Sequence, residues 1–315
     1  MPVTITAGIT FSGGGLTMAF APPSEATAGW WAGGGTPSVS SYVQRVTFAT
    51  DTATASIRGP LTVSRMSAGA VSTFTYGWIA AGYYPMTSTV ERITFASDTG
   101  ATSTRGPVAG RNGLSGAGND NYGWFGGWDN PAPSPSTVDR IEYAHDTATA
   151  SVRGPLSAAK RYLGTTGNSN YGYWAAGTSQ GGTQYSSIDR IDYGNDTAVA
   201  SVRGNISSNR YALTASTDGT TYGWFAGGAG GPVVSLIERI TYANDTATAT
   251  ARGPLVVATY SLAGTGSNTY GYYGGGGGPK SNVQRITYAT DTDVASTRGY
   301  LAAAAYGAAA CSGIQ

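Results

Sequence analysis

Arginine and aspartate recur in this chain at a fixed spacing, and their chemistry has to be explained first. An arginine is followed six residues later by an aspartate and thirteen residues later by a second arginine, and this triplet occurs six times. The first arginines are Arg45, Arg92, Arg140, Arg190, Arg239 and Arg285; the aspartates are Asp51, Asp98, Asp146, Asp196, Asp245 and Asp291; the second arginines are Arg58, Arg105, Arg153, Arg203, Arg252 and Arg298. Such groups can bind an anion, cleave a glycoside or pair with one another.

Strict periodicity favours pairing over catalysis. Arg239 alternates with Ile240 and Tyr242, so it points away from the apolar face of its strand. A covered guanidinium needs carboxylate or carbonyl partners, because an unpaired buried charge is very costly. We therefore expect each periodic arginine to pair with acidic or carbonyl groups of its own or the next repeat, which forms a ring of polar links. The aspartates usually follow Asn or Thr in turns, where we expect them to accept hydrogen bonds from turn amides.

Other residues with reactive side chains are few. The chain has one histidine, His145, and one cysteine, Cys311. We therefore expect no disulfide, no Cys/His metal site and no cofactor. His145 replaces the Asn, Thr or Ser that precedes the turn aspartate, which predicts a solvated turn residue. The glycine run 274–278 lies between strands rather than before a helix, so we do not expect it to bind phosphate.

The elements that carry these residues are short strands. The first arginines are 47, 48, 50, 49 and 46 residues apart, and a period of this length predicts a propeller or a related array. In the fourth repeat we expect strands at 162–166, 171–176, 188–193 and 198–203, separated by Asn, Asp and Gly. No window shows a helical apolar period, so helix content should be close to nil. The prediction is an all-β fold, a six-bladed propeller with four-stranded antiparallel blades.

The ends of the chain must close the ring. Residues 1–15 read as an extended segment, either a tether or an edge strand, and 16–315 as a single propeller. Leu301–Ser312 repeats the pattern of a first strand, but no second strand follows it. We expect residues 306–311 to form the innermost strand of the first blade, beside Trp30. The alternative is that Leu16–Ala21 fills that place. Closure would remove exposed strand edges.

Composition excludes several partners. Only 11% of residues are charged, against ~25% in a typical soluble domain, and the net charge is +1. Twelve of the sixteen arginines occupy the periodic positions, which leaves no basic stripe, so we expect no nucleic-acid binding. No run approaches ~18 apolar residues, and the N-terminus lacks the features of a signal peptide. We expect no membrane insertion, and a single cysteine is typical of folding in the cytoplasm.

The order of motifs resembles the kelch repeat over nearly the whole chain. Arg-Tyr-x-Leu-x-Ala precedes Tyr-Gly and two aromatic residues; then come a double glycine, a variable loop and a strand that ends in an aromatic residue. The double glycines are Gly33-Gly34, Gly126-Gly127, Gly227-Gly228 and Gly274-Gly275, with Ala-Gly in two repeats. The fourth-strand tryptophan of kelch repeats is replaced here by Ala, Val or Ile. The repeated Asp-Thr-Ala-Thr-Ala and Arg-Gly-Pro-Leu segments are most similar to kelch-like arrays encoded by marine bacteriophages.

This resemblance implies a non-enzymatic structural or binding propeller on a phage particle, as a surface, spike or tail-fibre component. Its location would be the virion or the extracellular space, and its partners other virion proteins, a cell-surface receptor or a glycan. The variable loops after the double glycines supply the candidate ligand-binding residues, because they should gather on one face. These residues are Tyr83, Tyr84, Trp128, Asp129, Asn130, Gln184 and Tyr185.

Two alternatives remain open. The first is a cellular or secreted kelch-like module that binds protein or glycan. The second is a sialidase-like glycoside hydrolase, because Ser97-Asp98-Thr99-Gly100 resembles the Asp-containing turns of those six-bladed enzymes. Sialidases also need a clustered arginine triad that breaks the repeat symmetry, and the arginines of this chain are nearly all periodic.

Overall fold

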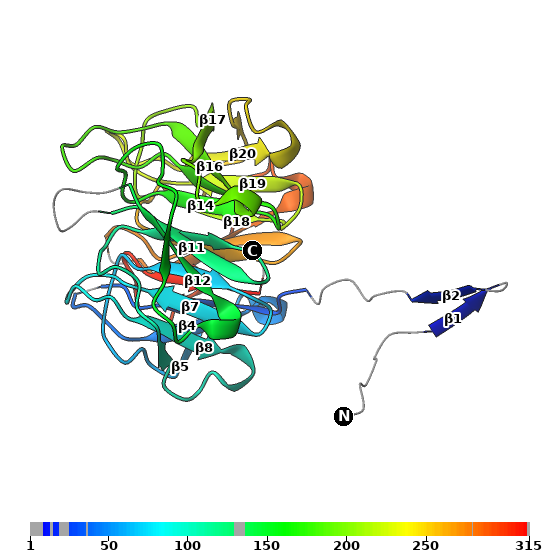
Figure 1. Ribbon diagram of the computed structural model, residues 1–315. Helices are drawn as coiled ribbons and strands as arrows, with labels where there is room; N and C mark the ends of the chain where they lie inside the picture. The colour runs from blue at the N-terminus through cyan, green and yellow to red at the C-terminus, as the bar shows by residue number, and fades with distance from the viewer. Residues whose placement is uncertain are drawn as a thin grey trace.

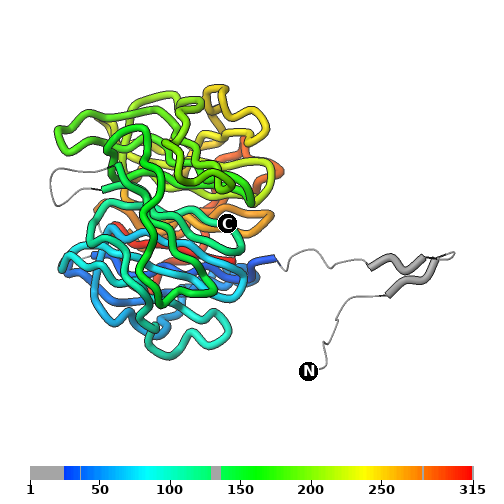
Figure 2. Tube along the Cα trace, in the orientation of Figure 1, coloured from blue at the N-terminus to red at the C-terminus, as the bar shows by residue number. Residues whose placement is uncertain are grey.

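The chain folds as a six-bladed β-propeller (Figures 1 and 2). The computed structural model describes residues 25–35, 37–128, 136–278 and 280–313, together with the backbone of 9–12 and 15–18. Within these ranges each blade is a four-stranded antiparallel sheet, and the helical elements are 3-10 turns of three residues. The predicted fold class is confirmed.

Within each blade the four strands follow one another from the axis outward, the innermost first. Blade 1 contains β26 (Ala309–Cys311), β3 (Ala28–Ala32), β4 (Val43–Thr47) and β5 (Ser56–Arg58). Blade 2 contains β6 (Gly69–Ser72), β7 (Tyr76–Ala80), β8 (Val90–Thr94) and β9 (Ser103–Arg105). Blade 3 contains β10 (Ser115–Gly118), β11 (Tyr122–Gly126), β12 (Val138–Glu142) and β13 (Ser151–Arg153).

Blade 4 contains β14 (Gly164–Gly167), β15 (Tyr171–Ala175), β16 (Ser187–Asp192) and β17 (Ser201–Asn205). Blade 5 contains β18 (Thr214–Thr217), β19 (Tyr222–Ala226), β20 (Ile237–Thr241) and β21 (Thr250–Ala251). Blade 6 contains β22 (Ala263–Gly266), β23 (Tyr270–Gly274), β24 (Asn282–Thr287) and β25 (Ser296–Tyr300). The 3-10 turns follow the third strands: η1 (Phe48–Thr50), η2 (Phe95–Ser97), η3 (Tyr143–His145), η4 (Tyr193–Asn195), η5 (Tyr242–Asn244) and η6 (Tyr288–Thr290).

The C-terminal strand closes the ring, as the sequence predicts. In β26, Ala310 lies opposite Trp31 and Cys311 opposite Trp30. The described part of the alternative segment is Leu16–Met18, which belongs to β2 (Gly15–Met18) and pairs with β1 (Ile9–Ser12) in a separate two-stranded sheet. The domain boundary expected after residue 15 therefore falls inside this hairpin, and the first strand of the ring is β3.

The propeller has two unlike faces. One carries the loops between second and third strands and the connections between blades, and we call it the loop face. The other carries the turns between first and second strands and the 3-10 turns, and we call it the turn face. Because β3 starts and β26 ends at the turn face, the chain enters and leaves the ring there. Residues of Glu25–Ala28 and Ser312–Gly313 line one cavity on that face.

Aromatic side chains fill the space between neighbouring blades. The ring of Trp78 on β7 stacks on Tyr143 of the next blade, with 4.1 Å between ring centroids. The equivalent stacked pairs are Trp30–Phe95, Trp124–Tyr193, Tyr173–Tyr242, Trp224–Tyr288 and Tyr272–Phe48. The second-strand members are almost fully buried. Each core cluster therefore spans two blades, and burial of these large aromatic side chains holds neighbouring blades together.

Candidate functional site

Every turn aspartate bonds to the blade that precedes it. The Asp98 carboxylate of blade 2 accepts a hydrogen bond from Trp30 Nε1 at 2.8 Å and forms ion pairs with Arg45 at 3.3 Å and Arg58 at 3.5 Å, all from blade 1. The other five sets are Asp146 with Trp78, Arg92 and Arg105; Asp196 with Trp124, Arg140 and Arg153; Asp245 with Tyr173, Arg190 and Arg203; Asp291 with Trp224, Arg239 and Arg252; and Asp51 with Tyr272, Arg285 and Arg298.

We call these six sets the turn-face girdle. Of the partners that the sequence left open, the arginines therefore use an acid of the next repeat, and they do so at every blade boundary, including the one where blade 6 meets blade 1. The turn-capping role that we expected of the aspartates was wrong, because the 3-10 turn directs each carboxylate against the indole or phenol and the guanidinium groups of the preceding blade.

The main chain adds a second link at each boundary. The amide of Gly59, which follows a girdle arginine, donates to the carbonyl oxygen of Asp98 at 2.8 Å. A Cβ atom at Gly59 would lie 1.6 Å from the carbonyl oxygen of Gly100, so any larger residue would push the blades apart. This close approach explains the glycine of the repeated Arg-Gly-Pro motif.

Electrostatics support a structural role for the girdle. Burial alone would raise the pKa of Asp245, but the hydrogen bond from Arg203, the charge of Arg190 and the hydrogen bond from Tyr173 outweigh it and lower that pKa. The carboxylate is thus held ionised and fully engaged. A group in this state stabilises the fold and is poorly placed to act as a general acid.

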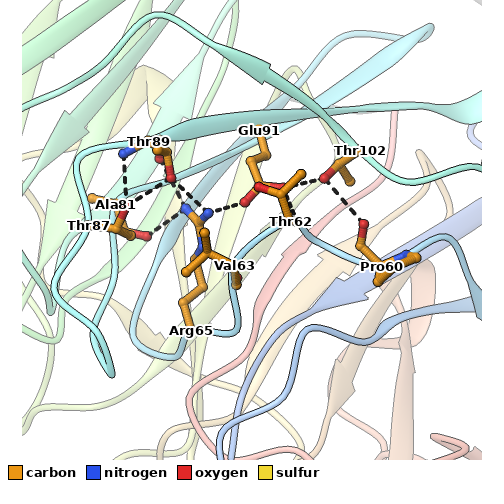
Figure 3. Close-up of polar contacts among 9 residues, drawn as sticks. All are labelled: Pro60, Thr62, Val63, Arg65, Ala81, Thr87, Thr89, Glu91 and Thr102. Carbon is orange, nitrogen blue, oxygen red and sulfur yellow. Dashed lines mark hydrogen bonds and ion pairs between the residues drawn. The ribbon is translucent and has the colours of Figure 1, made fainter.

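A second set of charges is buried within single blades. In blade 2, the Arg65 guanidinium forms an ion pair with Glu91 and donates to the carbonyl oxygens of Ala81 and Thr89, each at 3.0 Å (Figure 3). Burial lowers the pKa of Arg65, and the nearby Glu91 carboxylate opposes that shift. Blades 3, 4 and 5 contain the equivalent pairs Arg111–Asp139, Lys160–Asp189 and Arg210–Glu238.

Blades 6 and 1 replace this pair by neutral residues. The position of the acid is Gln284 in blade 6 and Gln44 in blade 1, and the position of the cation is Thr259 and Ala305. Gln284 accepts a hydrogen bond from the Val257 amide at 3.0 Å, which is the task that Glu91 performs for the Thr62 amide at 2.7 Å. An acid therefore occurs only where its blade also supplies a cation.

Two of the predicted loop residues cover these buried cations. Trp128 lies in the loop of blade 3, with its ring 5.1 Å from the Arg111 guanidinium, and Tyr185 in the loop of blade 4 lies 5.3 Å from Lys160 Nζ. Both are half-buried, and such contacts stabilise a desolvated cation. Gln184 forms an isolated β-bridge with Thr178. Two further predicted loop residues, Asp129 and Asn130, lie outside the described residues.

At the axis of the loop face, six peptide groups form a closed ring of hydrogen bonds. Each residue donates its amide to the carbonyl oxygen of the equivalent residue in the preceding blade, at distances of 2.7 to 3.0 Å. The members are Ser67, Gly113, Tyr162, Ala212, Ser261 and Gly307, and their φ angles run from 52° to 70°. Tyr162 was predicted to lie in a strand, but β14 starts at Gly164 and Tyr162 belongs to this ring.

A left-handed tyrosine is unusual, because its Cβ is crowded in that conformation. Here the ring of hydrogen bonds holds its backbone, and its side-chain ring lies 5.4 Å from the Arg161 guanidinium. Burial raises the pKa of the Tyr162 phenol, and the groups whose charges also act on it are Arg161, Tyr306, Tyr83 and Tyr84. Tyr83 forms an isolated β-bridge with Met66, and Tyr84 lines a cavity with Met66 and Tyr306, so the two predicted residues lie beside residues outside the variable loops.

Beside this cluster the loop face has a cavity of about 460 Å³. Met66, Tyr84 and Tyr306 line it, together with the loop of blade 1 at Pro37–Val39. The rings of Tyr83 and Tyr84 contact each other with 4.0 Å between centroids, and Tyr84 is 57% exposed. We call Met66, Tyr83, Tyr84, Tyr162 and Tyr306 the axial tyrosine cluster. Exposed aromatic faces beside a concave surface suit a planar or ring-shaped ligand.

The residues considered for other chemistry lie elsewhere. His145 is 73% exposed in its turn, with Nδ1 3.3 Å from Glu142, which agrees with the predicted solvated turn residue. In the part of the chain that the structure describes, His, Cys, Asp and Glu form no group of three or more that could hold a metal ion. Within those same residues, no helix has the length and hydropathy needed to cross a membrane.

Comparison with known proteins supports the fold. No family model matches this chain, and no curated protein sequence matches it. Among solved structures, one described as "Structure of YjhT" aligns with a TM-score of 0.67 over 80% of this chain and 88% of that one, at 10% sequence identity. At this identity the likeness concerns the propeller architecture alone, so the function must be argued from the surface.

Proposed function

We propose that the protein is a non-enzymatic binding propeller of a bacteriophage particle, which presents its loop face to a cell-surface receptor or glycan. The observation that carries this proposal is the axial tyrosine cluster, in which Tyr84 is exposed beside a cavity of about 460 Å³. Rigid aromatic residues at the centre of a surface are frequent anchors of recognition, because they bury a large area with little loss of side-chain entropy.

The placement of charge supports a binding role over a catalytic one. The twelve girdle arginines are spread around the ring, two at each blade boundary, and three more lie in the buried pairs of blades 2, 3 and 5. A sialidase-like site needs arginines gathered at one place. The girdle carboxylates are each engaged by two guanidinium groups, whereas a glycosidase acid must keep its proton near neutral pH.

The geometry of the chain supports presentation of the loop face. The polypeptide joins the ring at the turn face, beside the cavity lined by Glu25 and Gly313. Attachment to a particle at that side would leave the axial tyrosine cluster on the opposite, outward side. The virion assignment itself comes from the resemblance of the repeats to kelch-like arrays of marine bacteriophages. Antibodies against the propeller should label purified particles in electron micrographs.

Attachment to host cells and to an immobilised glycan panel tests the binding role. We expect the double change Tyr83→Ala/Tyr84→Ala to weaken attachment about tenfold or more, since central aromatic anchors carry most of the binding energy. The melting temperature should stay close to that of the unmodified protein, because Tyr84 is largely exposed.

The matched control is Tyr300→Ala. Tyr300 is 53% exposed but lies on β25, the outermost strand of blade 6, far from the axis. Attachment should be unchanged in this variant. If the double variant and the control attach equally well, the loop-face proposal fails. Trp128→Ala is unsuitable here because it also uncovers Arg111 and should lower stability.

A further inference from the structure

Five of the six blades share a stacked tyrosine on the turn face. The second strand of blade 5 starts with Tyr222, whose ring centroid lies 4.1 Å from the Arg239 guanidinium. The same ring meets Trp224 edge-on at 5.8 Å between centroids. The equivalent tyrosine–arginine pairs are Tyr76–Arg92, Tyr122–Arg140, Tyr171–Arg190 and Tyr270–Arg285, at 4.2 or 4.3 Å. Each tyrosine covers a girdle arginine, and in blades 2, 3, 5 and 6 it also contacts the aromatic residue two positions further on.

Blade 1 lacks this tyrosine. Its second strand starts with Ala28, and the arginine and aromatic residue that a tyrosine would cover are Arg45 and Trp30. The Arg45 side chain is 28% exposed, whereas the five equivalent side chains are 16 to 21% exposed. Trp30 is 5% exposed, against 1% or less for its five equivalents. Both differences follow from the missing ring.

The space that a tyrosine ring fills in the other blades is, in blade 1, part of a cavity of about 400 Å³. Ala28, Trp30 and Arg45 line it on the side of blade 1, and Phe74 and Phe95 on the side of blade 2. Phe74 is 40% exposed and stands in the turn between first and second strands, where the other turns carry Asn, Asp, Ser, Thr and Gly. The one place that lacks the stacked tyrosine is thus bordered by the one exposed phenylalanine of these turns.

We propose that this cavity is a socket for an aromatic side chain, preferably tyrosine, of a partner protein that docks on the turn face. The five equivalent positions show what fits there: a phenol ring stacked on the guanidinium, which in blades 2, 3 and 5 is also edge-on to an indole. Asp98 pairs with the Arg45 guanidinium, and the exposed face of that group remains available for stacking. Phe74 adds an apolar wall that the other five positions do not have. The socket lies on the side at which the chain enters the propeller, opposite the axial tyrosine cluster.

The test uses p-cresol, which reproduces the tyrosine side chain, as the probe. Binding to the full chain is measured by NMR titration and located by a crystal soak. We expect one saturable site in blade 1. Ala28→Tyr, which places the missing ring in the chain itself, should weaken p-cresol binding at least tenfold. Tyr222→Ala should create a second site in blade 5. As a control, 4-methylcyclohexanol, which has a similar size but no aromatic face, should bind at least tenfold more weakly.

Absence of p-cresol binding to the unmodified protein, or binding that Ala28→Tyr leaves unchanged, would overturn the proposal. If Ala28→Tyr fails to fold, Tyr222→Ala still decides, because no new site in blade 5 would show that these positions do not accept a free ring. A dimer in sedimentation that Ala28→Tyr abolishes would place a second copy in the socket and reject a partner protein. None of these measurements depends on the loop-face proposal.

Discussion

The two sets of ion pairs, the turn-face girdle and the buried pairs near the loop face, differ in how many blades contain them. The turn-face girdle occurs at all six blade boundaries, whereas the buried pair near the loop face occurs in only four blades. The girdle joins neighbouring blades, so a change in one aspartate affects two arginines and an aromatic side chain of another blade. The buried pair lies within one blade, so both of its members can change together without consequence for the neighbours.

At the positions of the buried pair, all six blades share a hydrogen bond from a backbone amide to the acid or glutamine side chain, whereas only four blades have the charges. Glu91 accepts from the Thr62 amide, and Gln44 accepts from the Ala303 amide, both at 2.7 Å. A glutamine performs this task without needing a cation. From this comparison we expect the charge pair to be exchangeable with the neutral residues of blades 6 and 1, and the girdle, which is present at all six boundaries, to be needed at each of them.

Breaking one buried pair should give the largest effect. Arg65→Met leaves the fully buried Glu91 carboxylate without its counterion, and we expect the free energy of unfolding to fall by about 3–5 kcal/mol. Urea denaturation followed by tryptophan fluorescence measures this change.

The double variant Arg65→Thr/Glu91→Gln gives blade 2 the residues that blade 6 has at these positions, and it tests whether the charged and neutral pairs are exchangeable. It should recover most of the loss, to within about 1.5 kcal/mol of the unmodified protein, because replacing both members removes the unpaired charge. A double variant as unstable as Arg65→Met would show that the two solutions are not exchangeable.

Removing a girdle charge should give a smaller effect. Asp51→Asn keeps an acceptor for the Tyr272 hydroxyl but leaves Arg285 and Arg298 without a counterion at the closing boundary. We expect a loss of about 1–3 kcal/mol, since these arginines retain some solvent and are less costly to leave unpaired than Arg65. The measurement is again urea denaturation.

Asp196→Asn makes the corresponding change between blades 3 and 4, where the four strands of blade 4 are consecutive in the chain, and serves as the matched variant. If the girdle is required equally at every boundary, the two losses should agree within about 0.5 kcal/mol. A negligible effect at Asp51 beside a clear effect at Asp196 would mean that β26 alone closes the ring.

The sequence predicted only one half of the girdle. The cost of burying charge required partners for the periodic arginines in their own or the next repeat, but the aspartates were assigned to turn capping, so Asp98 was not identified as the partner of Arg45. The buried pairs were harder to predict. Arg65 is one of the four arginines outside the periodic positions, but nothing in the sequence shows that Glu91, which directly precedes the girdle residue Arg92, is its partner.

The axial tyrosine cluster was predicted only in part. Tyr83 and Tyr84 stand in a variable loop, which is where recognition residues gather, so they were found. Tyr162 was assigned to a strand, because its left-handed conformation depends on hydrogen bonds between blades that sequence does not show. That Ala28 replaces the tyrosine of the other repeats can be seen in the sequence, but the arginine and the cavity that this leaves uncovered are known only from the structure.

The smallest expected effect concerns the contribution of Asp245 to stability in acid. The folded-state pKa of Asp245 is lowered below its ordinary value of 3.8, so its contribution to stability is present above that value and is lost as the pH falls through the folded-state pKa. We therefore expect the free energy of unfolding to decrease with acidification below about pH 4. In Asp245→Asn this part of the decrease should be absent, so the acid limb of the stability profile should be shallower, although the variant is less stable at neutral pH. Urea titrations between pH 3 and pH 7 provide the profile. An acid limb of unchanged steepness would mean that Asp245 titrates alike in the folded and unfolded chains, and that its two arginines add geometry to the girdle without adding charge stabilisation.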